Sequence, residues 1–166
     1  MRDDVRKAAI DGVGFGLVAG MIFALAQIAA AAYAGTPLLP LRMSASVVMG
    51  RAALEATPLG IATLVGLGVH LALSALFGLA YGLLDGERPQ EPARSWARQA
   101  GFGTLYGMVL WLIDFQIVGR FSHPWFLAVP QLGQAVMHAF FFGLPLALMY
   151  VQRARHARPQ EMLQAA

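Results

Sequence analysis

Four long apolar segments constrain the fold of this chain more than any other feature of its sequence. They run approximately over residues 8–34, 58–84, 99–119 and 125–151. Each is long enough to cross a hydrocarbon core of ~30 Å, which takes about 20 helical residues. A membrane-spanning strand would alternate polar and apolar residues, whereas these segments are continuously apolar with small residues at helical spacing. We therefore predict an all-α integral membrane protein with four transmembrane helices.

The composition of the chain indicates the same class. Hydrophobic residues make up 58% of the 166 residues and charged residues 13%, against roughly 45–50% and 25% in soluble domains. The net charge is +3, but the basic residues lie beside the apolar segments rather than in one patch, so we expect no nucleic-acid partner. Cysteine is absent, which excludes disulfides, cysteine-held iron–sulfur clusters and a thiol nucleophile.

The basic residues are distributed unevenly between the two sides of the predicted spans. Nine flank the termini or lie between the second and third spans: Arg2, Arg6, Lys7, Arg88, Arg94, Arg98, Arg153, Arg155 and Arg158. The other three are Arg42, Arg51 and Arg120. The positive-inside rule places the side with more basic residues in the cytoplasm. We therefore expect both termini to be cytoplasmic.

An octet near the N-terminus recurs later in the chain. The sequence "GFGLVAGM" at 14–21 returns as "GFGTLYGM" at 101–108, and the same shift aligns Pro37 with Pro124 without a gap. Each copy continues into a second apolar segment that contains one histidine. These observations predict two tandem helical hairpins that enter the membrane in the same direction. Chance similarity between glycine-rich helices is the alternative.

The repeat defines the organisation of one membrane domain. Its predicted parts are a first repeat over 8–84, a cytoplasmic linker over 85–98, a second repeat over 99–151 and a basic C-terminal tail over 152–166. Glycines four residues apart, such as Gly12, Gly16 and Gly20, predict close packing between helices rather than ligand binding.

Each predicted span carries polar residues on one of its faces. They are Gln27, His70, Ser74, Asp114, Gln131, Gln134 and His138. At about 1.5 Å of rise per residue, Gln27, Asp114 and the two histidines lie at similar depths. Ionisable residues inside a span usually face the bundle interior and pair with one another. We therefore expect one internal polar cluster.

Three interpretations of this polar cluster are open. It can be a satisfied hydrogen-bond network in which Asp114 pairs with His70 or His138. It can be a proton or ion path, because an aspartate with histidines binds and releases protons near neutral pH. It can also hold haem b between His70 and His138 as axial ligands.

Catalysis is not expected from the sequence. Zinc needs three or four convergent ligands, and the chain has no closely spaced histidine pair to supply them. The glycine-rich octets lack the lysine and hydroxyl residue of a phosphate-binding loop. We expect no metal, no catalytic residue and no required cofactor.

The two connections on the outer side of the predicted spans differ in length. Residues 37–58 predict an amphipathic helical segment that lies on or dips into the outer surface, with Arg51 able to pair with Glu55. The second connection, 120–124, is short. Trp125 follows it and is typical of an interfacial anchor.

The run "HLALSALFGLAYG", which begins at His70, resembles the H-x-x-x-S-x-x-F-x-x-x-Y pattern of YagU-like small bacterial inner-membrane proteins. A third span that ends in a Pro-Trp loop and precedes a histidine-containing fourth span is similar too. The resemblance implies a multi-pass protein of the bacterial inner membrane with a link to acid resistance. The matching positions are His70, Ser74, Phe77, Tyr81, Pro124, Trp125 and His138.

Two classes of function follow from these features. The small soluble regions and glycine-lined helices favour a non-catalytic membrane component, free-standing or an accessory or structural subunit of a larger assembly. Its partners would be the lipid bilayer and other membrane subunits. The polar cluster favours instead a small proton or ion transporter or channel that uses Asp114 and the intramembrane histidines.

Overall fold

The computed structural model of the chain describes residues 2–86 and 95–153, and every secondary-structure element within them is a helix. Four of these helices are long and apolar enough to cross a membrane. They run over Val5–Tyr33, Leu59–Asp85, Trp96–Phe121 and Gln131–Arg153. The prediction of an all-helical chain with four such helices is confirmed. The predicted linker and C-terminal tail lie largely outside the described residues.

The first two long helices are regular, whereas the third changes its winding. They are α1 (Arg2–Tyr33) and α4 (Leu59–Gly86). The third, which we call helix three, consists of α5 (Trp96–Trp111), the π-helical segment η1 (Leu112–Val118) and α6 (Gly119–Phe121). A π-helical turn inserts extra backbone into an α-helix, and such segments are frequent at functional sites.

The fourth long helix begins later than the sequence predicts. We call it helix four; it consists of α7 (Gln131–Met137), the π-helical segment η3 (His138–Gly143) and a further stretch that ends at residue 153. The predicted span starts at residue 125, but Pro124–Ala128 form the short 3-10 helix η2. Val129 is extended before Pro130, because a residue that precedes proline avoids the α conformation. The prediction for the start of this span is therefore wrong.

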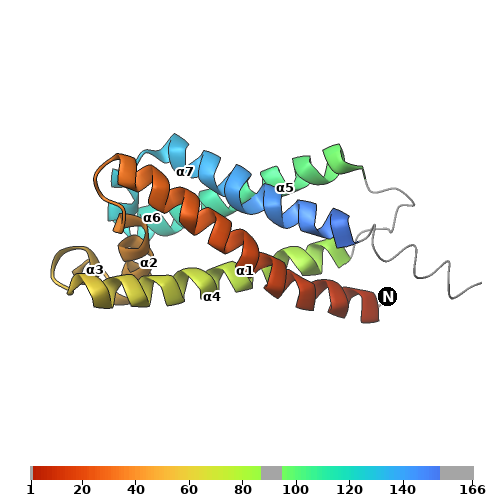
Figure 1. The fold of residues 1–166 in the computed structure, drawn as a ribbon, viewed down its shortest axis with the longest axis horizontal. Coiled ribbons are helices and arrows are strands. Elements are labelled where there is room, and N and C mark those ends of the chain that lie inside the picture. Colours follow the sequence, from red (N-terminus) through yellow and green to blue (C-terminus); the bar gives the residue numbers. More distant parts are fainter. Residues whose placement is uncertain (1, 87–94, 154–166) are drawn as a thin grey trace, which may run out of the picture.

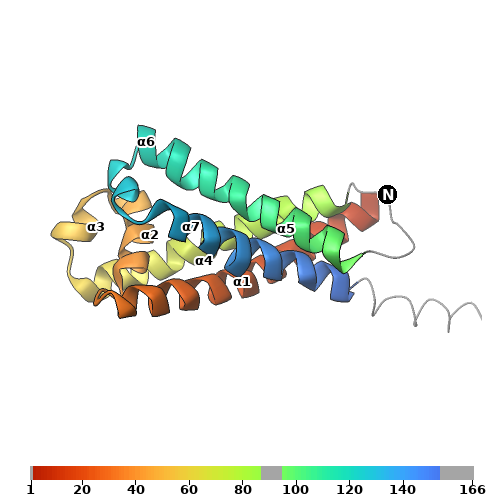
Figure 2. The ribbon, with the colours of Figure 1, turned by 90° about the horizontal axis from the view of Figure 1, so that it is seen from above.

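The four long helices run along the length of the molecule, and two short helices lie at one end (Figure 1). The short helices are α2 (Leu39–Met49) and α3 (Ala52–Glu55); we call this the α2 end. The N-terminus lies at the opposite end (Figure 1). Figure 2 shows α1 and helix three on opposite sides of the bundle, and both pack against helix four, while α1 also packs against α4.

Glycines allow the closest helix contacts in the bundle. A Cβ at Gly78 of α4 would collide with the backbone of Gly12 and Gly16 in α1. A Cβ at Gly143 of helix four would likewise collide with the backbone of Gly103 and Gly107 in α5. Both contacts depend on the missing side chain, as the four-residue glycine spacing predicts.

The short helix α2 packs into the bundle rather than lying beside it. Its residues Leu41, Met43, Ala45 and Ser46 are buried, and it approaches α4 where a Cβ at Gly66 would collide with the carbonyl of Leu41. The Arg42 side chain donates to the carbonyl oxygens of Ala53, at 3.0 Å, and Leu54. Arg42 thereby ties α2 to α3, and the pair forms a fixed cover at this end of the bundle.

At the opposite end, aromatic side chains fill the space between α4 and α5. Tyr81 packs against Phe102 and Tyr106, with ring centroids 5.5 and 5.1 Å apart. The Tyr106 hydroxyl donates to the Phe77 carbonyl at 2.6 Å. This bond to a backbone carbonyl satisfies the Tyr106 hydroxyl inside an apolar core.

Candidate functional site

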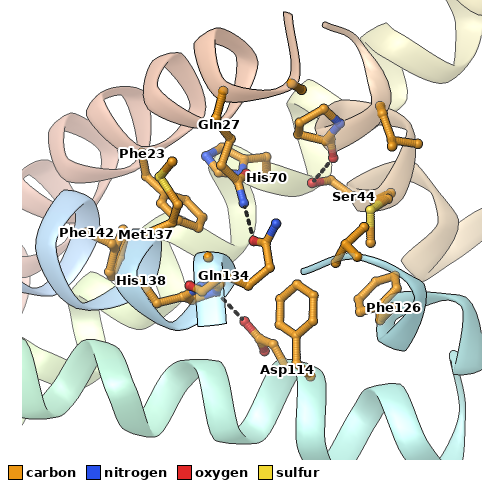
Figure 3. A pocket seen from close by; sticks show the side chains of 18 of the residues that line it. Phe23, Gln27, Ser44, His70, Asp114, Phe126, Gln134, Met137, His138 and Phe142 are labelled. Atoms are coloured by element: carbon orange, nitrogen blue, oxygen red, sulfur yellow. Dashed lines mark hydrogen bonds and ion pairs between the residues drawn. The ribbon is translucent and has the colours of Figure 1, made fainter. Parts of the chain in front are cut away.

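A cavity of about 400 Å³ lies between the long helices at the α2 end (Figure 3). Its walls come from α1, α2, α4, helix three, helix four and the segment around η2. Five phenylalanines line it: Phe23, Phe77, Phe115, Phe126 and Phe142. The contribution of α2 is Leu39, Pro40, Met43, Ser44 and Val47. The cavity is therefore largely apolar, and the cover formed by α2 is part of its wall.

An acid and a histidine form a pair at the cavity wall. The Nε2 atom of His138 lies 3.6 Å from the Oδ2 atom of Asp114. Asp114 lies in η1 and His138 begins η3, so both π-helical segments contribute to the pair. The His138 side chain is 6% exposed and the Asp114 side chain 25%, so the carboxylate is the more accessible partner. Figure 3 shows Asp114 pointing from helix three toward helix four.

The contact of the second ring nitrogen of His138 shows which nitrogen carries a hydrogen. This nitrogen lies 2.7 Å from the carbonyl oxygen of Gln134, which can only accept, so Nδ1 carries a hydrogen. A carboxylate facing Nε2 then needs one more proton, on the imidazole or on the acid, to form a hydrogen bond. With that proton the pair has no net charge, and without it the net charge is −1.

Two glutamines join α1 to helix four beside this pair. The Nε2 atom of Gln27 donates to the Oε1 atom of Gln134 at 2.8 Å (Figure 3). Gln134 thus contacts both residues: its side chain accepts from Gln27, and its backbone carbonyl accepts from His138. The bond satisfies two amides that would otherwise be costly to bury.

The other histidine of the predicted cluster contacts a backbone carbonyl. His70 Nε2 lies 2.8 Å from the carbonyl oxygen of Gly20. The Ser74 hydroxyl donates to the His70 carbonyl at 2.7 Å within the same helix. Ser74 also sits against Gly20, where a Cβ would collide with it. His70 and Ser74 therefore fasten α4 to α1 and line the cavity.

The arrangement of the two histidines does not fit haem. The Phe23 ring stacks on His70 at a centroid distance of 5.7 Å and meets His138 edge-on at 4.7 Å. A porphyrin with two axial histidines would need the space that this ring fills. His70 Nε2 also faces the carbonyl oxygen of Gly20, which can only accept, so this nitrogen carries a hydrogen and has no lone pair for an iron.

Two of the predicted positions lie apart from the polar cluster. Gln131 donates to the carbonyl oxygens of Phe126, at 3.0 Å, and Val129, at 2.9 Å, and accepts from Gln116 at 3.0 Å. It therefore holds the segment around η2 in place. Trp125, expected as an interfacial anchor, also contacts α2: its indole nitrogen donates to the buried Ser46 hydroxyl at 2.8 Å.

The sequence interpretation missed several residues of the cavity. Phe23, Phe115 and Phe126 line it, but phenylalanine is common in any apolar span and gives no signal by itself. Outside the cavity lining, Gln116, which donates to Gln131, was detectable as a polar residue inside the third segment. Within residues 2–86 and 95–153, no three His, Cys, Asp or Glu side chains come together as a group that could hold a metal ion.

No protein-family model, curated protein or solved structure matches the chain. The geometry of the cavity therefore carries the functional argument.

Proposed function

We propose that this chain is a small non-catalytic membrane protein that binds a ligand in the cavity at its α2 end. The observation that carries the proposal is the cavity itself. Protein interiors are close-packed, with few voids larger than a water molecule, whereas this cavity is about 400 Å³. Ligand sites have volumes of about 300–1,000 Å³ and combine apolar walls with a few convergent polar groups. Gln27, Asp114 and His138 provide those polar groups.

The exposed surface of the long helices supports insertion in a bilayer. Large apolar side chains are exposed along all four, for example Leu25 at 62%, Leu64 at 72%, Leu105 at 61% and Leu132 at 79%. Apolar surface on this scale is covered by lipid or by other proteins. The bilayer is the proposed partner, and other membrane subunits can cover part of the same surface if the protein is an accessory component.

The proposed orientation follows the positive-inside rule. Both termini lie in the cytoplasm, so the α2 end and its cavity face the outer half of the membrane. The resemblance to YagU-like proteins supports the bacterial inner membrane as its location.

A tandem duplication is consistent with the glycine contacts. Gly20 of α1 meets His70 and Ser74 of α4, and Gly107 of α5 meets the backbone of His138 in helix four. These two glycines correspond under the repeat, and each contacts the histidine region of its own hairpin. The π-helical segments lie in the second hairpin, which supports divergence of the second copy toward the acid–histidine pair.

Proton or ion handling is the second candidate function. It is favoured by the Asp114–His138 pair, which places a carboxylate and an imidazole, two groups able to accept and release a proton, beside the cavity. Purified protein in proton-loaded vesicles should then support a pH-dependent flux that Asp114→Asn removes. Equal flux through wild type and variant would exclude this role for the pair.

Filling the cavity tests the binding function. Ala31 lines the cavity, and Ala31→Phe should occupy part of it, whereas Ala29→Phe adds the same side chain at an exposed position that does not line it. Small molecules extracted from protein purified in native-lipid nanodiscs are quantified by mass spectrometry. A stoichiometric compound should be present in wild type and Ala29→Phe and absent in Ala31→Phe. Its presence in all three proteins would contradict binding in the cavity.

A further inference from the structure

We propose that the cavity binds an amphiphilic organic cation, a molecule with an apolar body and a protonated amine, and that the amine displaces the proton of the Asp114–His138 pair. This inference rests on the proposed binding function and names the class of ligand. The amine would bind the Asp114 carboxylate, and the apolar body would lie against the phenylalanine-rich walls.

The charge of the cavity lining favours a cation. Asp114 is the one acidic side chain among the lining residues, and no lysine or arginine lines the cavity within the described chain. A carboxylate surrounded by apolar side chains is costly unless a cation or a proton neutralises it. The cavity therefore offers a single negative site with no competing permanent positive charge.

The hydrogen bonding of Asp114 leaves room for a donor. A carboxylate has about four acceptor positions. The backbone carbonyl of Asp114 accepts from the Gly119 N–H, but its carboxylate accepts no hydrogen bond from the described residues. The nearest ionisable group to this carboxylate is His138, whose Nε2 atom lies 3.6 Å away. This distance is longer than the usual donor–acceptor distance of about 2.7–3.2 Å in N–H···O bonds. An ammonium group can donate up to three hydrogens, so it can fill the acceptor positions of the Asp114 carboxylate that His138 leaves vacant.

The aromatic walls favour the same ligand class. Phe115 follows Asp114 in the chain and is buried with Phe126, their centroids 5.5 Å apart. Faces of aromatic rings attract cations, and the attraction increases when water is excluded. An amine at Asp114 would thus lie beside rings that also pack against its apolar body.

Proton exchange makes binding electrically neutral. The protonated pair has no net charge; when the cation binds, its ammonium stays protonated, the pair releases one proton to water, and the remaining −1 charge of the pair is balanced by the ligand. The titratable groups around Asp114 are His138 on helix four, His70 on α4 and Tyr106 on its own helix. The residues of α1 and α2 that line the cavity are uncharged.

The test compares two probes that share the same phenylbutyl body and end in an ammonium group or in a neutral hydroxyl group. Binding of radiolabelled phenylbutylamine and phenylbutanol is measured on the full-length protein in phosphatidylglycerol nanodiscs, with protein-free nanodiscs as the blank. Linkage to one released proton predicts that amine affinity rises by up to tenfold per pH unit over the range in which the pair holds its proton. Alcohol affinity should not change with pH.

Two variants separate the role of Asp114 from a general loss of charge. Asp114→Asn should lower amine affinity at least tenfold and remove its pH dependence. Glu55→Gln removes one negative charge on α3, outside the cavity lining, and should behave as wild type. Competition by phosphatidylethanolamine nanodiscs would identify a lipid headgroup as the source of the amine, and its absence would indicate a free amine.

The outcomes distinguish this inference from the proposed function. If the alcohol binds and the amine does not, or if Asp114→Asn keeps the pH dependence, the cation assignment is wrong while binding in the cavity stands. If neither probe binds, both proposals are overturned.

Discussion

The contact between α1 and α4 predicts a large effect for one added methyl group. An ideal Cβ at Gly78 would lie 2.5 Å from the Gly16 Cα atom and would also collide with the Gly12 carbonyl. Carbon atoms pack at about 3.5–4.0 Å, so Gly78→Ala requires the helices to separate locally by about 1 Å. Overpacking costs about 1–3 kcal/mol, and the better helix propensity of alanine offsets up to about 1 kcal/mol. We expect the free energy of unfolding to fall by about 1–2 kcal/mol.

A second glycine of the same helix provides the control for this prediction. A Cβ at Gly68 has no neighbour within 4 Å, so Gly68→Ala should leave stability unchanged or raise it by up to about 1 kcal/mol. Both variants are unfolded by sodium dodecyl sulfate in mixed micelles, and helix content is followed by circular dichroism. If the two variants unfold at the same detergent fraction, the close backbone contact does not stabilise the bundle and the reasoning is refuted.

Three further predictions concern two contacts near the α2 end and the orientation of the chain in the membrane. Trp125→Phe removes the indole bond to α2 and should lower the free energy of unfolding by about 0.5–1.5 kcal/mol in the same assay; no change would show that this bond does not hold α2. Gln27→Leu should cost about 1–3 kcal/mol because it leaves Gln134 unsatisfied, whereas Gln27→Leu with Gln134→Leu should cost less than the single change; additive costs would argue against the pairing. In intact cells, a membrane-impermeant thiol reagent should label Ser122→Cys and not Ser95→Cys, and the reverse pattern would invert the proposed orientation.

The sequence predicts the long helices well because continuous apolar length is a local property. Their ends depend on backbone detail, and the start of helix four shows this: residues 124–128 are apolar enough to extend a span but wind as a 3-10 helix before Pro130. The amphipathic segment over 37–58 was also detectable. Its close approach to α4 was not, because it depends on the missing side chain of Gly66 in another helix.

The candidate site was predictable only as a set of polar residues at similar depth. Depth left Asp114 free to pair with either histidine, and the structure pairs it with His138 at 3.6 Å. Both residues lie in π-helical segments, which leave no clear mark in the sequence. Gln131 shares a helical face with His138 but lies about 10 Å further along the axis at 1.5 Å per residue, so it belongs to the η2 segment instead.

The position of the acid and its partner on consecutive long helices bears on how the chain would be made. In a bilayer, an unpaired aspartate at mid-span costs about 2.5–3.5 kcal/mol during insertion. The partner of Asp114 is on helix four, which is synthesised after helix three. Helix three would therefore insert stably only after helix four had been synthesised, so the two helices would leave the insertion machinery together. The helices α1 and α4 could pack earlier through their glycine contact.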